Sequence, residues 1–217
     1  MVESPGGASA RQRIGLGWPL TAGVALGIAS FCADLAEGTL RTVLQFGAST
    51  GFAWGCAAFV AALPARTRRG ALAAAVIVLC TATGCYYWLN LPGGAFRALL
   101  QAFSYWLLLS IAGGSLLGVL AHAVRHDGPR RAAIAAGVAC GLLAGAGIAI
   151  VVIPGQRFGG AGEAVLQAVA GVAVATWSFA RRRGPRAWPV YGTAALLACT
   201  AGALAWALIE SVPVKGF

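Results

Sequence analysis

Residues 132–153 read AAIAAGVACGLLAGAGIAIVVI, a run without a single charged side chain that directly follows Arg130-Arg131. At about 1.5 Å per residue, a helix of this length crosses the roughly 30 Å hydrocarbon layer of a bilayer. Six further runs of this kind fill most of the 217-residue chain. Backbone amides in hydrocarbon have no water to bond, so each run is expected to coil into a helix. We therefore predict an all-α, polytopic transmembrane bundle with seven spans, over residues 15–34, 42–63, 70–90, 97–123, 132–153, 162–180 and 187–209.

The composition excludes an ordinary soluble domain. Hydrophobic residues make up 59% of the chain and charged residues only 10%, whereas soluble proteins carry about 25% charged residues. A net charge of +10 can indicate a nucleic-acid-binding protein. Here, however, the basic residues stand at the ends of apolar runs and not on a separate domain, so the expected partner is the lipid bilayer and not nucleic acid. All but one of the 16 basic residues are arginine, and Ala and Gly are abundant. This bias is typical of a GC-rich genome, and we expect a bacterial plasma membrane.

The connections between runs are short and rich in turn formers, as in Leu91-Pro92-Gly93-Gly94. They leave no room for a second domain. We predict a cytoplasmic tail over residues 1–14, a single transmembrane domain over 15–210 and an outer tail over 211–217.

The first run also resembles a signal peptide, whose removal would leave six spans. It has a basic start followed by an apolar stretch. Bulky Phe31 stands just before Cys32, where a cleavage site needs a small residue. We therefore expect the first helix to be retained.

Basic residues alternate between the two sides of the predicted bundle. Connections rich in Lys and Arg usually face the cytoplasm, so we predict an inner N-terminus and an outer C-terminus. We interpret the inner arginine clusters as topology determinants that also attract anionic headgroups, and not as a specific site. The richer side holds Arg11, Arg13, Arg66, Arg68, Arg69, Arg125, Arg130, Arg131, Arg181, Arg182, Arg183 and Arg186, and the poorer side holds Arg41, Arg97, Arg157 and Lys215.

Glycines recur every four positions on several predicted helices. Such spacing forms a groove in which a second helix backbone can approach closely. Packing within one chain is the favoured interpretation, because a seven-helix bundle has many interfaces to fill. Homo-oligomerisation or docking of a membrane-protein partner is the alternative. The helix-packing candidates are Gly47, Gly51 and Gly55 in the second run and Gly137, Gly141 and Gly145 in the fifth.

We expect neither an enzyme nor a bound cofactor or metal. The chain has no HExxH motif and no phosphate-binding loop. His122 and His126 stand one turn apart but have no third ligand at suitable spacing. All six cysteines fall inside apolar runs without a CxxC motif, which is typical of buried free thiols.

Polar and aromatic residues gather at the predicted outer ends of several helices. Ionisable groups near the hydrocarbon layer are costly, so they often mark a functional cavity. The alternative is that these groups cap helix ends among the lipid headgroups, with arginine side chains reaching toward water. The candidate ligand-binding residues are Asp34, Glu37, Tyr86, Tyr87, Asn90, Arg97, Gln101, Glu163 and Gln167.

Four motifs carry a resemblance to a known group of proteins: Trp54-Gly55, Arg68-Arg69, Cys85-Tyr86-Tyr87-Trp88 and Gly113-Gly114-Ser115-Leu116-Leu117-Gly118. The chain resembles small multispan actinobacterial membrane proteins of unknown function, which implies a plasma-membrane helical bundle with no assigned activity. It is more faintly similar to the substrate-capture subunits of vitamin importers, which usually have six spans.

These observations lead to two predictions of function. The first is a non-enzymatic membrane component with an accessory or structural role. The alternative is a small-molecule transporter or substrate-capture subunit that uses the outer polar residues as its pocket.

Overall fold

The computed structural model describes residues 8–91, 96–152, 161–180 and 185–211, and every regular element in these ranges is a helix. The predicted all-α class is therefore confirmed. Six helices are long and apolar enough to cross a membrane, and a bent pair raises the number to seven. The elements are α1 (Ala8–Leu35), α2 (Gly38–Leu44), the π-helix η1 (Gln45–Ser49), α3 (Gly51–Ala62), α4 (Arg68–Asn90), α5 (Phe96–His126), α6 (Pro129–Val152), α7 (Ala161–Ala180), the 3-10 helix η3 (Pro185–Ala187) and α8 (Trp188–Ser211).

The second predicted span is not the continuous helix that its apolar run indicates. The segment Gly38–Ser49 and helix α3 meet at an angle of 47°. Thr50 lies between them in extended backbone, with φ −99° and ψ 150°, and its hydroxyl accepts a 3.1 Å hydrogen bond from the backbone N–H of Ala53. The prediction of one uninterrupted helix over 42–63 was wrong, because Thr50 ends one helix and caps the next.

A set of hydrogen bonds from α1 and α3 satisfies the backbone at this break. The hydroxyl of Ser30 on α1 donates to the carbonyl of Ala48 at 2.6 Å. The indole N–H of Trp54 donates to the same carbonyl at 2.5 Å and approaches Ser30 Oγ at 3.2 Å. An unpaired carbonyl inside hydrocarbon costs several kcal/mol, so this clasp of Ser30, Ala48 and Trp54 stabilises the bend.

The register of α1 on α4 shows that the bent pair crosses the bundle. A Cβ built on Gly23 would lie 2.8 Å from Thr81 Cβ, and one on Gly27 would lie 2.8 Å from Cys85 Cβ. Contacts that advance together along both helices mean that α1 and α4 run parallel. The segment that joins the end of α1 to the start of α4 must therefore return across the bundle. This path favours counting the bent pair as one broken span, which gives up to seven candidate spans.

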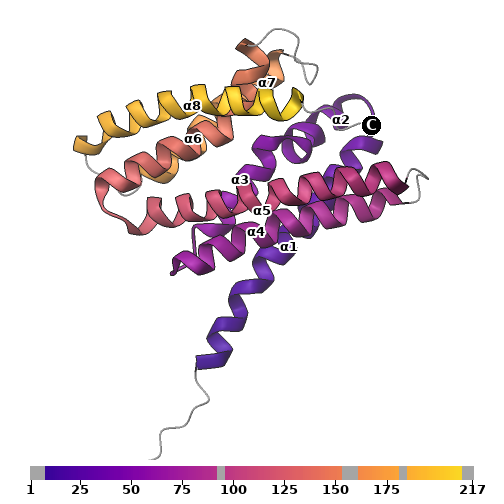
Figure 1. The fold of residues 1–217 in the computed structure, drawn as a ribbon, viewed down its shortest axis with the longest axis horizontal. Coiled ribbons are helices and arrows are strands. Elements are labelled where there is room, and N and C mark those ends of the chain that lie inside the picture. The colour runs from indigo at the N-terminus through magenta and orange to yellow at the C-terminus, as the bar shows by residue number, and fades with distance from the viewer. Residues whose placement is uncertain (1–7, 92–95, 153–160, 181–184, 212–217) are drawn as a thin grey trace, which may run out of the picture.

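The second half of the chain repeats this arrangement. Gly137 of α6 lies against Ala194 of α8, where an added Cβ would be 2.6 Å from the Ala194 Cβ, and Gly145 lies against Gly202. Helices α6 and α8 are thus parallel, and α7 returns between them in the chain. The two three-helix units, Ala8–Asn90 and Pro129–Ser211, are equal in length, and α5 joins them (Figure 1).

The glycine stripes differ in what they contact. The fifth-run stripe of Gly137, Gly141 and Gly145 lies along α8, and α5 places Gly114 and Gly118 on α4. In the second run, a Cβ on Gly55 would meet Leu143 Cδ2 at 2.8 Å, but Gly47 has nothing within 4 Å of its Cβ position.

Helix α6 is the centre of the bundle, and α8 lies at its edge. Two-thirds of the hydrophobic window of α6 is buried, against 11% of that of α8. The core around α6 contains the fully buried side chains of Phe59, Leu143 and Phe179. Leu196 and Leu204 of α8 are exposed on its other side, where the apolar surface would contact lipid.

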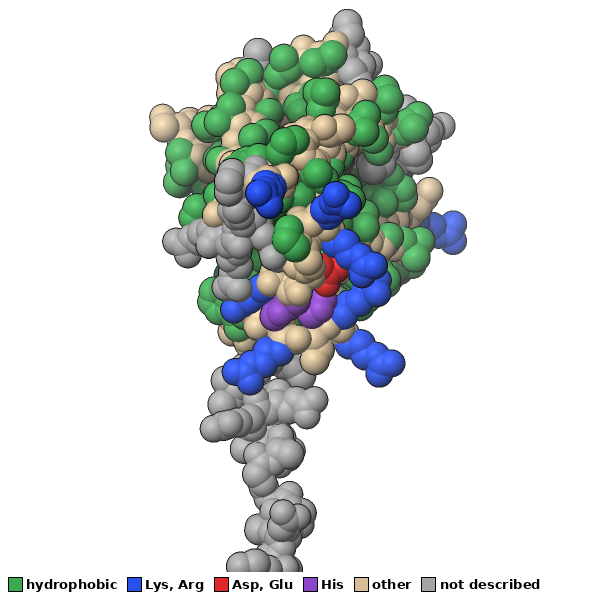
Figure 2. All heavy atoms as spheres, turned by 90° about the vertical axis from the view of Figure 1, so that its left-hand side faces the viewer, with side chains coloured by type: hydrophobic (Ala, Val, Ile, Leu, Met, Phe, Trp, Pro, Cys, Tyr) green, Lys and Arg blue, Asp and Glu red, His purple; other side chains and the backbone are tan. Residues whose placement is uncertain are grey.

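Arginines gather at one end of the molecule, which we call the arginine-rich end; the opposite end is the arginine-poor end. The α3–α4 turn, the α5–α6 turn and η3 before α8 lie at the arginine-rich end, and Figure 2 shows basic side chains around the two histidines and one acidic residue. This is the distribution from which we predict the orientation in the membrane. The members of the predicted inner set whose side chains the structure describes are Arg66, Arg68, Arg69, Arg125, Arg130, Arg131 and Arg186.

Candidate functional site

A cavity of about 290 Å³ lies at the arginine-poor end, between the last turns of α4 and the first turns of α5. The two helices are antiparallel, so their ends meet on either side of the connecting turn. Gly84 contributes space, because a Cβ there would meet nothing within 4 Å. The lining is almost entirely apolar and consists of Gly84, Tyr87, Trp88, Leu91, Phe96, Leu99, Leu100 and Phe103.

Edge-to-face contacts between aromatic rings stabilise the positions of the side chains that line this cavity. Tyr87 meets Phe103 with ring centroids 5.7 Å apart and planes at 70°. Tyr86 meets Tyr87 at 5.2 Å and 88°. Such contacts contribute about 0.5–1.5 kcal/mol each beyond area burial. They fix the aromatic rings in place before any ligand arrives.

A polar pair stands beside the aromatic wall. The hydroxyl of Tyr86 donates a 2.7 Å hydrogen bond to Asp34 Oδ2, which joins α4 to the end of α1. The side-chain amide of Asn90 donates at 2.9 Å to the carbonyl of Tyr86, one turn back on the same helix. Asp34 is exposed whereas Tyr86 is half-buried. The pair lies on the side of α4 that faces α1, and it reaches the cavity only through the ring contact of Tyr86 with Tyr87.

The structure divides the predicted ligand-binding residues between two regions. Asp34, Tyr86, Tyr87 and Asn90 come together as described above. Arg97 and Gln101 are exposed on α5, next in sequence to the cavity residues Phe96 and Leu100, and Glu37 is exposed before α2.

The other two predicted residues lie in the second three-helix unit. Glu163 and Gln167 are on α7, which packs on α6, and the Gln167 amide donates to Glu163 Oε1 at 3.5 Å. Gln167 is buried. The cavity between α4 and α5 includes neither residue.

Sequence reasoning missed most of the cavity wall. Phe96, Leu99, Leu100 and Phe103 follow the i, i+3, i+4, i+7 spacing of one helical face. That spacing was a usable signal, but on an apolar helix it does not distinguish a ligand-facing side from a lipid-facing one.

Thiols and histidines form pairs but no larger cluster. Cys140 Sγ on α6 and Cys199 Sγ on α8 are 3.9 Å apart, and the rings of His122 and His126 are 4.6 Å apart. In the described ranges no three His, Cys, Asp or Glu side chains come close enough to hold a metal ion.

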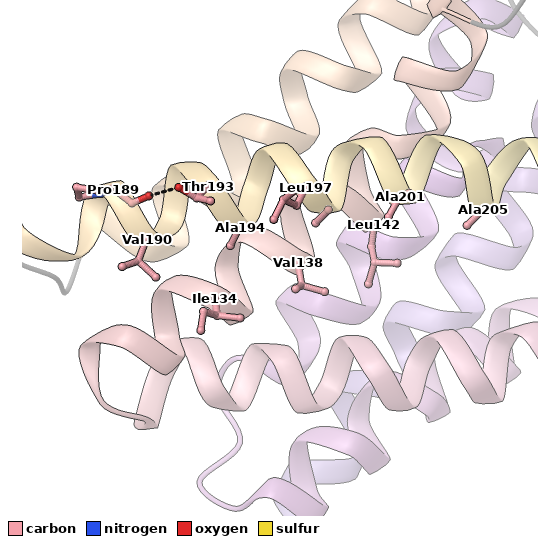
Figure 3. A pocket seen from close by; sticks show the side chains of 12 residues that line it. Ile134, Val138, Leu142, Pro189, Val190, Thr193, Ala194, Leu197, Ala201 and Ala205 are labelled. Carbon is pink, nitrogen blue, oxygen red and sulfur yellow. Dashed lines mark hydrogen bonds between the residues drawn. The ribbon is translucent and has the colours of Figure 1, made fainter.

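A second hollow is a groove of about 870 Å³ along α6 and α8 (Figure 3). Its residues point from both helices into the space between them, and the side chains of α8 in it are mostly small. The groove is lined by Ile134, Val138, Leu142, Pro189, Val190, Thr193, Ala194, Leu197, Ala198, Ala201, Gly202 and Ala205.

Comparison with known proteins gives a family and no activity. The profile of a family of unknown function, DUF6518, matches residues 8–210. The chain belongs to the DUF6518 family. The match runs from the start of α1 to the last turn of α8. No curated protein and no solved structure matches this DUF6518 chain. The likeness to vitamin-importer subunits and the actinobacterial origin stay predictions.

Proposed function

We propose that this multispan DUF6518 protein is a non-enzymatic membrane component that binds a small, largely apolar molecule at the cavity between α4 and α5. The aromatic wall of that cavity carries the proposal, because rigid rings favour a planar apolar ligand. A volume of about 290 Å³ limits the ligand to one or two rings. Tyr86, which donates to Asp34, contacts the cavity residue Tyr87 and so supports the aromatic wall from outside the cavity. Capture of such a molecule from the membrane surface fits the predicted substrate-capture role.

A pair of glycine variants tests this proposal. Gly84→Leu fills the cavity without a backbone clash, since the Cβ position of Gly84 is open. Gly113→Leu is the matched control: its Cβ position is also open, and it lines neither hollow. The protein in lipid nanodiscs is titrated with 2-naphthol, and the rise in melting temperature is followed. A ligand at one hundred times its Kd adds about 2.7 kcal/mol of stability.

The expected result is a concentration-dependent rise in the unmodified protein and in Gly113→Leu, and none in Gly84→Leu. Equal responses in all three would show that 2-naphthol acts through the lipid and would contradict the proposal. Native mass spectrometry of the unmodified protein provides a second measurement, in which a retained small molecule should be lost from Gly84→Leu.

The groove along α6 and α8 favours a second candidate function, which is an accessory role. Small residues line it, and they allow another helix backbone to approach closely. The occupant would be one transmembrane helix of a partner or of a second copy. Ala201→Trp obstructs this groove and should abolish association measured by cross-linking in membranes. Leu204→Trp, which lies on α8 outside the groove, is the control and should not. A monomer that cross-links to nothing in its native membrane would rule out this second function.

A further inference from the structure

We infer that the arginine-rich end is a binding surface for the phosphate headgroups of anionic phospholipids. The surface is formed by Arg66, Arg68, Arg69, Arg125, Arg130 and Arg131, from the α3–α4 turn and the α5–α6 turn. All but Arg125 are exposed. Because these turns join the ends of membrane spans, their side chains lie at headgroup level.

Two hydrogen bonds tie the two turns into one surface. The guanidinium of Arg125, at the end of α5, donates at 2.6 Å to the carbonyl of Leu63, which follows α3. The next residue, His126, places its Nε2 atom 3.2 Å from the carbonyl oxygen of Ala65. The arginines of both turns are therefore held together as a single cluster, which Figure 2 shows at this end of the molecule.

The first turns of α4 and α6 carry arginines at positions where a helix favours an anion. Arg68 and Arg69 begin α4, while Arg130 and Arg131 lie in the first turn of α6, and neither first turn contains an acidic residue. The N-terminus of a helix carries about +0.5 of a charge, so anions stabilise it and cations do not. Asp127 is the one carboxylate in the described part of these turns. A phosphate would relieve the repulsion at both helix ends at once.

The membrane itself is the source of phosphate that the geometry favours. Basic residues at the ends of spans attract anionic headgroups with an energy of about 1 kcal/mol per residue. The clustered arginines can each donate two hydrogen bonds to one phosphate, which strengthens this attraction beyond general charge. A zwitterionic headgroup carries its own cation, which offsets the attraction of its phosphate to the cluster.

The test is selective lipid retention. The protein is purified in neutral detergent with equal amounts of phosphatidylglycerol and phosphatidylcholine, and bound lipids are counted by native mass spectrometry. Phosphatidylglycerol should predominate in the unmodified protein. The exposed pair Arg68→Gln with Arg69→Gln should lower that preference by roughly tenfold or more, as expected for two residues. Arg41→Gln with Arg97→Gln, at the arginine-poor end, is matched in charge and should leave the preference unchanged.

Three further arms make the outcome decisive. His126→Ala keeps every arginine but removes a tie between the turns, and it should also lower the preference. Stability provides an independent readout: phosphatidylglycerol should raise the melting temperature of the unmodified protein more than that of the Arg68/Arg69 variant. Equal retention of both lipids would overturn the inference. So would displacement of the lipid by millimolar inorganic phosphate, which would identify a site for a soluble anion.

Discussion

The hydroxyl of Tyr86 on α4 donates a 2.7 Å hydrogen bond to the carboxylate of Asp34 on α1. The bond connects two parallel helices close to the point where glycine packing brings their backbones together, since Gly27 lies about two turns before Asp34 on the same helix.

The Tyr86–Asp34 bond is expected to couple the two residues energetically. Tyr86→Phe and Asp34→Ala should each lower the free energy of unfolding, because a hydrogen bond to a charged group contributes about 1.5–3 kcal/mol. The double variant should lose less than the sum of the single variants, by at least about 1 kcal/mol. Unfolding in detergent mixtures measures all three. Additive losses would contradict the bond, and Glu37→Ala, at an exposed neighbouring position, is the control.

Close packing of α6 on α8 predicts opposite effects for two glycine-to-alanine changes. A Cβ on Gly141 would collide with the backbone carbonyl of Ala198, so Gly141→Ala should destabilise the protein by about 1–3 kcal/mol. Gly192 on α8 has nothing within 4 Å of its Cβ position. Gly192→Ala should therefore be neutral or stabilise by up to about 1 kcal/mol, through helix propensity alone. Thermal melts of both variants in one detergent decide the point; a stabilising Gly141→Ala would disprove the packing.

Parallel α1 and α4 predict that the broken span separates two compartments. In a variant with the native cysteines replaced by serine, Glu37→Cys and Arg66→Cys should react with a membrane-impermeant maleimide from opposite sides. By our predicted orientation, Arg66→Cys is labelled only from the cytoplasm. Labelling of both positions from one side would mean a re-entrant loop and six crossings.

Proximity of the two thiols between α6 and α8 predicts an intramolecular disulfide. Cys140 Sγ and Cys199 Sγ are 3.9 Å apart, and small rotations would bring them to the bond length of about 2.05 Å. Copper-phenanthroline should oxidise this pair, and peptide mapping should recover the cross-linked peptides. Cys140→Ser should eliminate that product while leaving Cys32, Cys80 and Cys85 available to alkylation. Recovery of a different pair instead would show another helix arrangement.

The fold class followed from the sequence because hydrocarbon leaves a long apolar run no option but a helix. The broken second span did not. Ser49-Thr50-Gly51 resembles a helix start, yet the break depends on Ser30 and Trp54, whose approach requires the folded bundle. Glycine spacing predicted that Gly141 would lie at a close helix contact, but the spacing does not indicate which residue of which helix packs against it. The structure identifies that partner as Ala198 of α8.

The candidate site was predictable in its polar part only. Asp34 and Tyr86 were selected because ionisable groups near hydrocarbon are rare, and the structure joins them. Glu163 was selected for the same reason, but it lies in the other three-helix unit. Short motifs recur in both units: Gly23-Val24-Ala25 with Gly137-Val138-Ala139, and Cys80-Thr81-Ala82 with Cys199-Thr200-Ala201. These repeats were the available signal that the chain divides into two halves.

Each three-helix unit has an odd number of crossings, which explains why α5 lies between the two units and belongs to neither. A unit of three crossings starts on one face of the membrane and finishes on the other, so a second copy fused directly to it would be inserted upside down. One additional helix brings the chain back to the starting face. Helices α6 to α8 can then adopt the same polarity as the first half, which places Arg186 before α8 on the same side as the arginines of the α3–α4 and α5–α6 turns.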